Sequence, residues 1–257
     1  MSDNQTRKFK FIGCEIVYRE ACYLAATGPH HVDVQFLRKG LHDLERADMN
    51  AKIQSAIDAV ETDCGYEAIL LGYGRCNDGL VGVTARDLPL VLPRAHDCIA
   101  FFFGSRRAYM RYFEEHPGTY YMTTGWAERN NFEQGQYSHP AYGKEGVMGK
   151  LGLAESYEEM VAKYGKDNAD FIRETMGDWK RNYSRMLYLE MGACDEAAMI
   201  ESSRAAARER QWEFEVRKGD WSLLRRLFYG QWDEDFLVLP PGAKVVARND
   251  DAVVDAQ

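Results

Sequence analysis

The chain has 257 residues, 46% of them hydrophobic and 28% charged, so it can bury a sizeable core and form one or two closely packed globular domains. Its formal net charge of −8, with no basic stripe, argues against nucleic acid as a partner. No apolar run approaches the ~18 residues of a membrane span, and the polar N-terminus lacks a signal region. We therefore expect a cytoplasmic protein with no membrane partner.

The first half of the chain alternates strand and helix patterns. Four β-rich or apolar runs predict strands, at Phe9–Tyr18, Val32–Leu37, Ala68–Gly72 and Leu88–Pro93. Apolar residues three and four apart predict one helix over Met49–Val60, and a second helix is predicted between His96 and Glu115. A further strand is predicted at Thr119–Thr123. This alternation predicts a three-layer α/β fold with a largely parallel sheet built from Rossmann-like βα units.

The second half begins with an irregular segment. Residues 128–152 are rich in Gly, Asn and Gln, which predicts an excursion able to cover a site. Helical patterns follow at Glu155–Tyr164, Asn168–Met191 and Asp195–Glu209. The strand signal returns on either side of a helix that starts after Asp220, at Trp212–Val216 and Phe236–Leu239, and AKVVA resembles one more strand.

These patterns predict four segments. An α/β core with the candidate metal ligands occupies 1–127, the excursion and an added helical segment occupy 128–210, a closing β-α-β unit of the same fold occupies 211–248, and 249–257 form a flexible tail. The helices predicted between Asn168 and Glu209 also suit a dimer surface, so a homo-oligomer stays open.

Three cysteines and one histidine fall where parallel strands are predicted to end. Cys14 follows the first strand, Cys76 follows the third, and His96 and Cys98 follow the fourth. Because a parallel sheet gathers the residues beyond the carboxyl ends of its strands into one crevice, we expect these four side chains to meet. Thiolates and an imidazole suit zinc, or alternatively a [4Fe–4S] cluster. The competing interpretation is that each cysteine is a small buried hydrophobe.

Four further residues are candidates for substrate binding. Glu15 and Arg94 flank the expected ligands, where one would orient a histidine and the other bind an anionic group. An ordinary salt bridge explains both equally well. Tyr120 and Trp126, in PGTYYMTTGW, are candidates for a pocket wall, and core packing is the alternative.

The runs GYGRCNDGLVG and LPLVLPRAHDC, followed by PGTYYMTTGW, resemble the signature of a bacterial and archaeal family described only as a domain of unknown function. The likeness extends over most of the chain. Members of this family are often encoded beside corrinoid-dependent methyltransferases, which implies a setting in one-carbon metabolism. It transfers no catalytic residue, because the family has no established mechanism.

We therefore expect a metal-dependent enzyme or accessory protein of methyl-group metabolism, acting on a small-molecule substrate or with a methyltransferase or corrinoid protein. Zinc would activate a bound thiol or water for methyl transfer. Two alternatives stay open. One is an iron–sulfur enzyme whose three-cysteine [4Fe–4S] cluster resembles that of quinolinate synthase. The other is a non-enzymatic metal- or corrinoid-handling protein with a structural zinc site. With a methyltransferase partner, the aromatic residues around Tyr120 and Trp126 would suit a cage for a methylated ammonium.

Overall fold

The structure is a computed structural model, and it describes residues 5–129, 157–176 and 182–257, without the side chains of 172–176. Its largest sheet has five strands in the order β2-β1-β3-β4-β8, of which the first four are parallel and β8 is antiparallel to β4. The strands are β1 (Lys8–Cys14), β2 (His31–Leu37), β3 (Ala68–Gly72), β4 (Leu90–Pro93) and β8 (Phe236–Leu239). Every residue of β3 and β4 is buried, as expected for continuous apolar strands covered on both faces.

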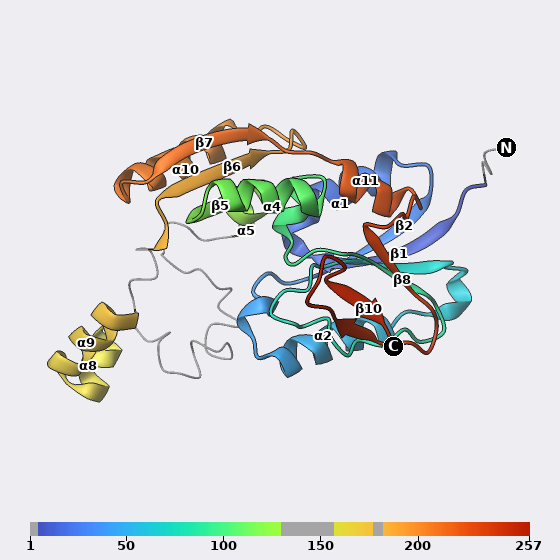
Figure 1. Cartoon of the computed structure of the whole chain (residues 1–257), viewed down its shortest axis with the longest axis horizontal. Helices are drawn as coiled ribbons and strands as arrows, with labels where there is room; N and C mark the ends of the chain where they lie inside the picture. Colours follow the sequence, from blue (N-terminus) through green and yellow to red (C-terminus); the bar gives the residue numbers. More distant parts are fainter. Residues whose placement is uncertain (1–4, 130–156, 177–181) are drawn as a thin grey trace.

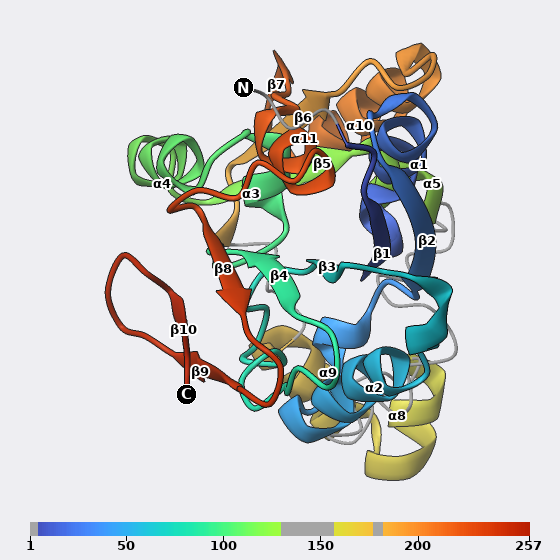
Figure 2. The ribbon, with the colours of Figure 1, turned by 90° about the vertical axis from the view of Figure 1, so that its right-hand side faces the viewer.

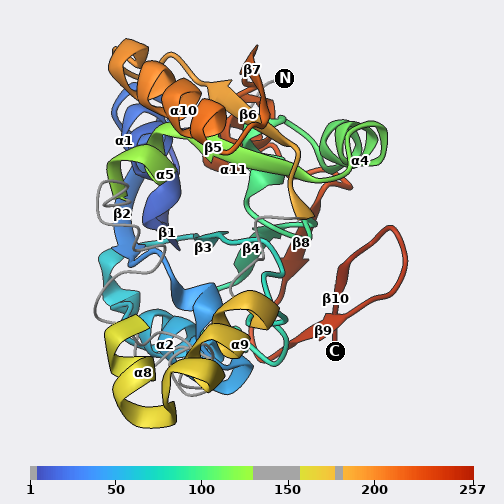
Figure 3. The same ribbon diagram turned by 90° about the vertical axis from the view of Figure 1, so that its left-hand side faces the viewer.

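Helices cover both faces of this sheet, so the predicted three-layer α/β fold is confirmed (Figure 3). On one face lie α1 (Tyr18–Thr27), α3 (Ile99–Phe102) and α11 (Ser222–Phe228), and on the other face lies α2 (Arg46–Asp58). The ring of Phe228 on α11 packs 4.8 Å from that of Phe11 on β1. Met49, Ile53 and Ile57 on α2 are buried, and this is the spacing that predicted the helix.

A second parallel sheet lies beyond the α1 layer (Figures 1 and 2). Its order is β5-β6-β7, with strands β5 (Thr119–Thr123), β6 (Arg185–Glu190) and β7 (Glu213–Lys218). It packs against α10 (Ala197–Glu209) around its own small core, in which Met122, Met186 and Tyr188 are buried. The two strands of the closing β-α-β unit predicted for 211–248 therefore belong to different sheets. β7 joins this sheet, and β8 joins the larger one.

The carboxyl ends of the two sheets meet. Phe103, just after α3, forms a bridge with Asp220, just after β7. The helix that follows β5, α5 (Thr124–Arg129), lies against the 3-10 turn η1 (Glu15–Val17) that follows β1. A Cβ added to Gly125 would lie 1.8 Å from the carbonyl oxygen of Ile16, so only glycine permits this approach.

The helix predicted over Asn168–Met191 is wrong in its second part. The structure has α8 (Tyr157–Tyr164) and α9 (Lys166–Met176), but Arg185–Glu190 is the central strand of the second sheet. Four consecutive residues of that strand are buried, and a short continuous apolar run has no period that separates strand from helix. The irregular excursion predicted for 128–152 lies outside the described residues from 130 onward.

The last residues form a hairpin. β9 (Val245–Ala247) pairs antiparallel with β10 (Val254–Ala256), and Val253 and Val254 are buried. The segment 249–257, expected to be a flexible tail, is therefore held by two buried valines that the acidic composition around them concealed. In Figure 3, α4 (Arg106–Glu115) and this hairpin lie on the same side of the molecule. None of the helices in the described ranges has the length and apolar content to cross a bilayer.

Candidate metal centre

Four neighbouring parallel strands each contribute a chemically active side chain at the same edge of the large sheet. Cys14 is the last residue of β1, Cys76 lies in the loop after β3, and Cys98 caps the N-terminus of α3 after β4. Lys39 lies two residues beyond the end of β2. Since β2, β1, β3 and β4 are adjacent in the sheet, residues spread over 85 positions of sequence come to one edge.

The three cysteines at this edge interact with one another as free thiols. Cys98 is hydrogen-bonded to Cys76, and this contact, followed by burial, raises the pKa of Cys98. Burial raises the pKa of Cys14 to about 12, and the nearby Cys76 adds to the effect. Three thiolates could therefore coexist here only beside a compensating positive charge, which is what a metal ligand set requires.

The loop that carries Cys76 is strained. Cys76, Asn77 and Asp78 have φ values of 30°, 49° and 58°, three consecutive non-glycine residues in the left-handed region. Each costs ~1 kcal/mol or more, and such backbone clusters at functional sites. Hydrogen bonds hold the loop in place, from the Cys76 N–H to the His96 carbonyl at 2.9 Å and from the Asn77 amide to the Leu44 carbonyl at 3.2 Å.

A close backbone approach holds Cys76 beside Cys98. A Cβ added to Gly74 would lie 2.6 Å from the backbone of Asp97, so the loops after β3 and β4 touch only because residue 74 is glycine. The Asp97 carboxylate accepts a hydrogen bond from the Ile99 N–H at 2.9 Å and another from the Tyr109 hydroxyl at 2.9 Å. These contacts position the first turn of α3, and with it Cys98.

Lys39 is the site residue that the sequence analysis missed. Its side chain is only 2% exposed, and its ammonium lies 4.2 Å from the ring centroid of Trp126. Burial lowers the pKa of Lys39 to about 8, against the opposing effects of Asp43, Cys14 and Glu15. The available signal was the Lys-Gly pair just after a predicted strand, because Gly40 takes a φ of 96° that turns the chain at this edge.

Glu15 holds Lys39 in place. Its carboxylate accepts a hydrogen bond from the Lys39 backbone N–H at 2.8 Å, and its other oxygen lies 3.6 Å from the Arg129 guanidinium. Glu15 was expected to orient a histidine or to form an ordinary salt bridge. The ion pair with Arg129 agrees with the second of these interpretations. The hydrogen bond from the Lys39 N–H also links the ends of β1 and β2.

The His96 side chain is at the surface, while its backbone carbonyl accepts a hydrogen bond from the Cys76 N–H at 2.9 Å. The expectation that His96 and Cys98 aim at one point required an extended backbone, but residues 96–98 form a bend and turn leading into α3. The His96 side chain is exposed and lines a pocket together with Arg75 and residues of α4. The structure thus brings together Cys14, Cys76 and Cys98, and the exposed His96 side chain lines a surface pocket.

The remaining candidates have other neighbours. Arg94 donates hydrogen bonds to the carbonyls of Phe236 and Ala252, at 3.3 and 3.1 Å, and to that of Val254, so its guanidinium ties the C-terminal hairpin to β4. The Tyr120 ring contacts those of the aromatic residues Tyr183 and Trp212. Trp126 instead contacts His42 and Lys39, so the two proposed cage residues face different partners.

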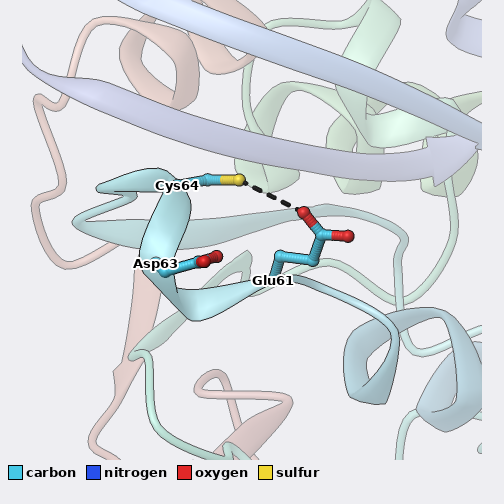
Figure 4. Close-up of side chains that lie close together, drawn as sticks. All are labelled: Glu61, Asp63 and Cys64. Atoms are coloured by element: carbon cyan, nitrogen blue, oxygen red, sulfur yellow. Dashed lines mark hydrogen bonds between the residues drawn. The ribbon is translucent and has the colours of Figure 1, made fainter.

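One other group of potential ligands lies on the surface (Figure 4). Among the described residues, Glu61, Asp63 and Cys64 form the one group of three whose donor atoms all lie within 4.8 Å of one another. They belong to a single exposed turn, and the Cys64 thiol is 3.6 Å from the Glu61 carboxylate. It follows that the sulfurs of Cys14, Cys76 and Cys98 do not all lie within this distance of one another, although Cys76 and Cys98 are hydrogen-bonded.

Comparison with known proteins gives a family and no function. A family model described as "Protein of unknown function (DUF1638)" matches residues 36–228. The matched region includes Lys39, Cys76, Cys98 and Trp126, and it begins after Cys14. No curated protein and no solved structure matches the chain.

Proposed function

The chain belongs to the family described as a protein of unknown function (DUF1638), and we propose that it is a metal-dependent enzyme or accessory protein of methyl-group metabolism. In this proposal the metal centre is held by Cys14, Cys76 and Cys98. The observation that carries it is the meeting of three free thiols from three adjacent strand ends, one of them on a strained loop. The methyl-group setting rests on the family resemblance.

The spacing of the thiols favours a single zinc ion, with a [4Fe–4S] cluster as the alternative. Four ligands around zinc, with Zn–S of ~2.3 Å, place their sulfurs about 3.8 Å apart, and the sulfurs of Cys76 and Cys98 are already within hydrogen-bonding distance. The three sulfurs do not all lie within 4.8 Å of one another, so zinc would need the third thiol, that of Cys14, to come closer. A [4Fe–4S] cluster is a larger body whose cysteine sulfurs stand farther apart, so Cys76 and Cys98 would have to separate to hold it. When bound by three cysteines, such a cluster supplies one iron as a Lewis acid for substrate.

Lys39 and Trp126 define the kind of substrate that this site would accept. The Lys39 ammonium is buried beside Cys14 and forms no ion pair with any described residue. A buried cation without an ion pair attracts an anionic group, such as a substrate carboxylate. Because Lys39 already lies over the Trp126 ring, a methylated ammonium would have to displace it there. An anionic substrate therefore fits this edge better than the methylated ammonium expected from the sequence.

The first test is metal and sulfide analysis with a visible spectrum, on protein purified without oxygen and without a metal-affinity column. We expect near-stoichiometric zinc without visible absorption. Iron and sulfide in about equal amounts, with a broad visible absorption, would replace the single ion by a cluster. Protein that contains no metal, and takes up neither iron–sulfide nor zinc when they are supplied, would overturn the proposal.

Two matched variants locate the centre. Cys98→Ser should lose most of the metal while keeping its unfolding midpoint, because the large sheet has its own core. Cys64→Ser removes a thiol from the exposed surface group and should keep the metal. The reverse result, with metal lost from Cys64→Ser and kept in Cys98→Ser, would assign the metal to the surface turn instead.

A further inference from the structure

The pocket lined by His96 has a volume of about 680 Å³ and adjoins the loops that carry Cys76 and Cys98. Residues of α4 and of the turn between β9 and β10 line it, and these two segments lie on the same side of the molecule (Figures 2 and 3). Six of its lining residues are basic, namely Arg75, His96, Arg106, Arg107, Arg111 and Arg248. This concentration stands out in a chain whose formal net charge is −8.

The arginines differ in how they are already paired. Arg75 is bound to Asp78, and Arg248 to Asp250 and Asp255. Arg107 and Arg111 lie one turn apart on α4, are exposed, and form no ion pair within the described part of the chain. Two guanidinium groups are therefore available side by side at the pocket.

The acidic residues of the pocket lie where water screens them. Glu114 and Asp250 line it, and Asp251 pairs with Arg106 at 3.0 Å. The Asp251 side chain is 97% exposed, and exposed ion pairs contribute little. Arg106, whose side chain is 22% exposed, can therefore exchange this carboxylate for a ligand anion.

We propose that this pocket binds the phosphate groups of a small organic di- or triphosphate. Planar guanidinium groups bind phosphate oxygens through paired charge-assisted hydrogen bonds, which is why arginine is preferred for this chemistry. The volume lies in the range of small-molecule sites, ~300–1,000 Å³, and exceeds the needs of a single phosphate. This inference is independent of the metal proposal.

Two residues that line the pocket, Arg75 and His96, belong to the loops that carry Cys76 and Cys98. The Arg75 N–H donates to the Ala95 carbonyl at 2.8 Å, and the Cys76 N–H donates to the His96 carbonyl at 2.9 Å. A phosphate bound between Arg75 and His96 would thus restrain the two loops that present Cys76 and Cys98. His96 acts in this pocket as a phosphate ligand, which explains its exposed position.

The test is isothermal titration calorimetry of the protein as purified, with pyrophosphate, triphosphate and ATP as probes and sulfate as a reference anion. The double variant Arg107→Gln/Arg111→Gln removes the two unpaired guanidinium groups. The control Arg208→Gln/Arg225→Gln makes the same change in net charge at two exposed arginines on other helices, α10 and α11.

We expect saturable binding of di- or triphosphate, much tighter than that of sulfate, which weakens at least about tenfold in Arg107→Gln/Arg111→Gln and changes less than about twofold in the control. Similar affinities for triphosphate and ATP would mean that the phosphates alone are bound, whereas tighter ATP binding would add the nucleoside. Absence of saturable binding, or an equal loss in both variants, would overturn the inference. Metal content should be the same in all three proteins, which separates this result from the fate of the metal centre.

Discussion

The carboxyl edges of the two parallel sheets are built alike and are filled differently. At the three-stranded sheet, the buried Glu196 carboxylate accepts hydrogen bonds from the Thr124 hydroxyl at 2.8 Å and from the Gly192 N–H at 2.6 Å. At the five-stranded sheet, the equally buried Lys39 ammonium forms no ion pair with a described residue. A buried polar group that its neighbours satisfy stabilises the fold, whereas a buried charge without an ion pair indicates where a ligand binds.

Glu20, beside the edge of the three-stranded sheet, is an exception to this rule. The carboxylate of Glu20 on α1 is fully buried and receives no hydrogen bond from another described residue. Burial, together with the nearby carboxylates of Glu196 and Glu128, raises the pKa of Glu20 to about 7. Glu20 is therefore held close to its protonated form at neutral pH, which lowers the cost of burying it.

The largest expected effect on stability is at the carboxyl edge of the three-stranded sheet. Glu196→Ala leaves the Thr124 hydroxyl and the Gly192 N–H buried without their acceptor, which should lower the free energy of unfolding by about 3 kcal/mol. Urea unfolding measures this, with Glu209→Ala, at an exposed position of the same helix, as the control. A loss no greater than that of the control would mean that these hydrogen bonds do not hold the edge together.

Glu20→Gln should stabilise the protein in a pH-dependent way. Because the folded-state pKa of about 7 exceeds the usual 4.5, the unfolded chain loses this proton first, and wild-type stability falls as pH rises from about 4.5 to about 7. The variant lacks this fall and should be about 2–3 kcal/mol more stable than wild type at pH 8, with little difference at pH 4.5.

Urea unfolding at both pH values tests this prediction, with the exposed Glu234→Gln as the control. A difference between Glu20→Gln and wild type that is the same at pH 4.5 and pH 8 would contradict the assignment of the raised pKa to Glu20.

Lys39→Met tests the carboxyl edge of the five-stranded sheet. Its effect on the free energy of unfolding should be opposite in sign to that of Glu196→Ala. Removing a buried ammonium should raise the stability of the metal-free protein by about 1 kcal/mol, since the lost contact with Trp126 offsets part of the gain. Unfolding of metal-free protein checks the sign. Destabilisation comparable to that of Glu196→Ala would make Lys39 a structural residue and remove the contrast between the edges.

The smallest effect is expected at His96, the predicted ligand whose side chain is exposed. His96→Ala should leave the metal content unchanged, because His96 is exposed in the arginine-lined pocket. Metal analysis beside Cys98→Ser, under identical preparation, gives the comparison. Loss of metal from both variants would restore His96 to the ligand set that the sequence analysis predicted.

The sequence determined by itself much of the large sheet and the place of the cysteines. The continuous apolar run Ala68–Gly72 is short and closely bounded by turn residues, which favours a buried strand over a helix, and β3 confirms this. Cys14, Cys76 and Cys98 were placed at one edge because parallel strands end on the same side of a sheet. That inference needs strand order only approximately, so local patterns are sufficient for it.

Only the tertiary structure decided which side chains face the thiols. Lys39 is buried because α5 packs against η1, a contact between segments about a hundred residues apart that depends on Gly125. His96 is exposed where residues 96–98 bend and turn toward α3, which begins at Ile99. Arg185–Glu190 becomes a strand because β5 and β7 flank it. For Lys39 and for this strand the deciding partner is distant in sequence, and burial, which depends on such partners, outweighs local propensity.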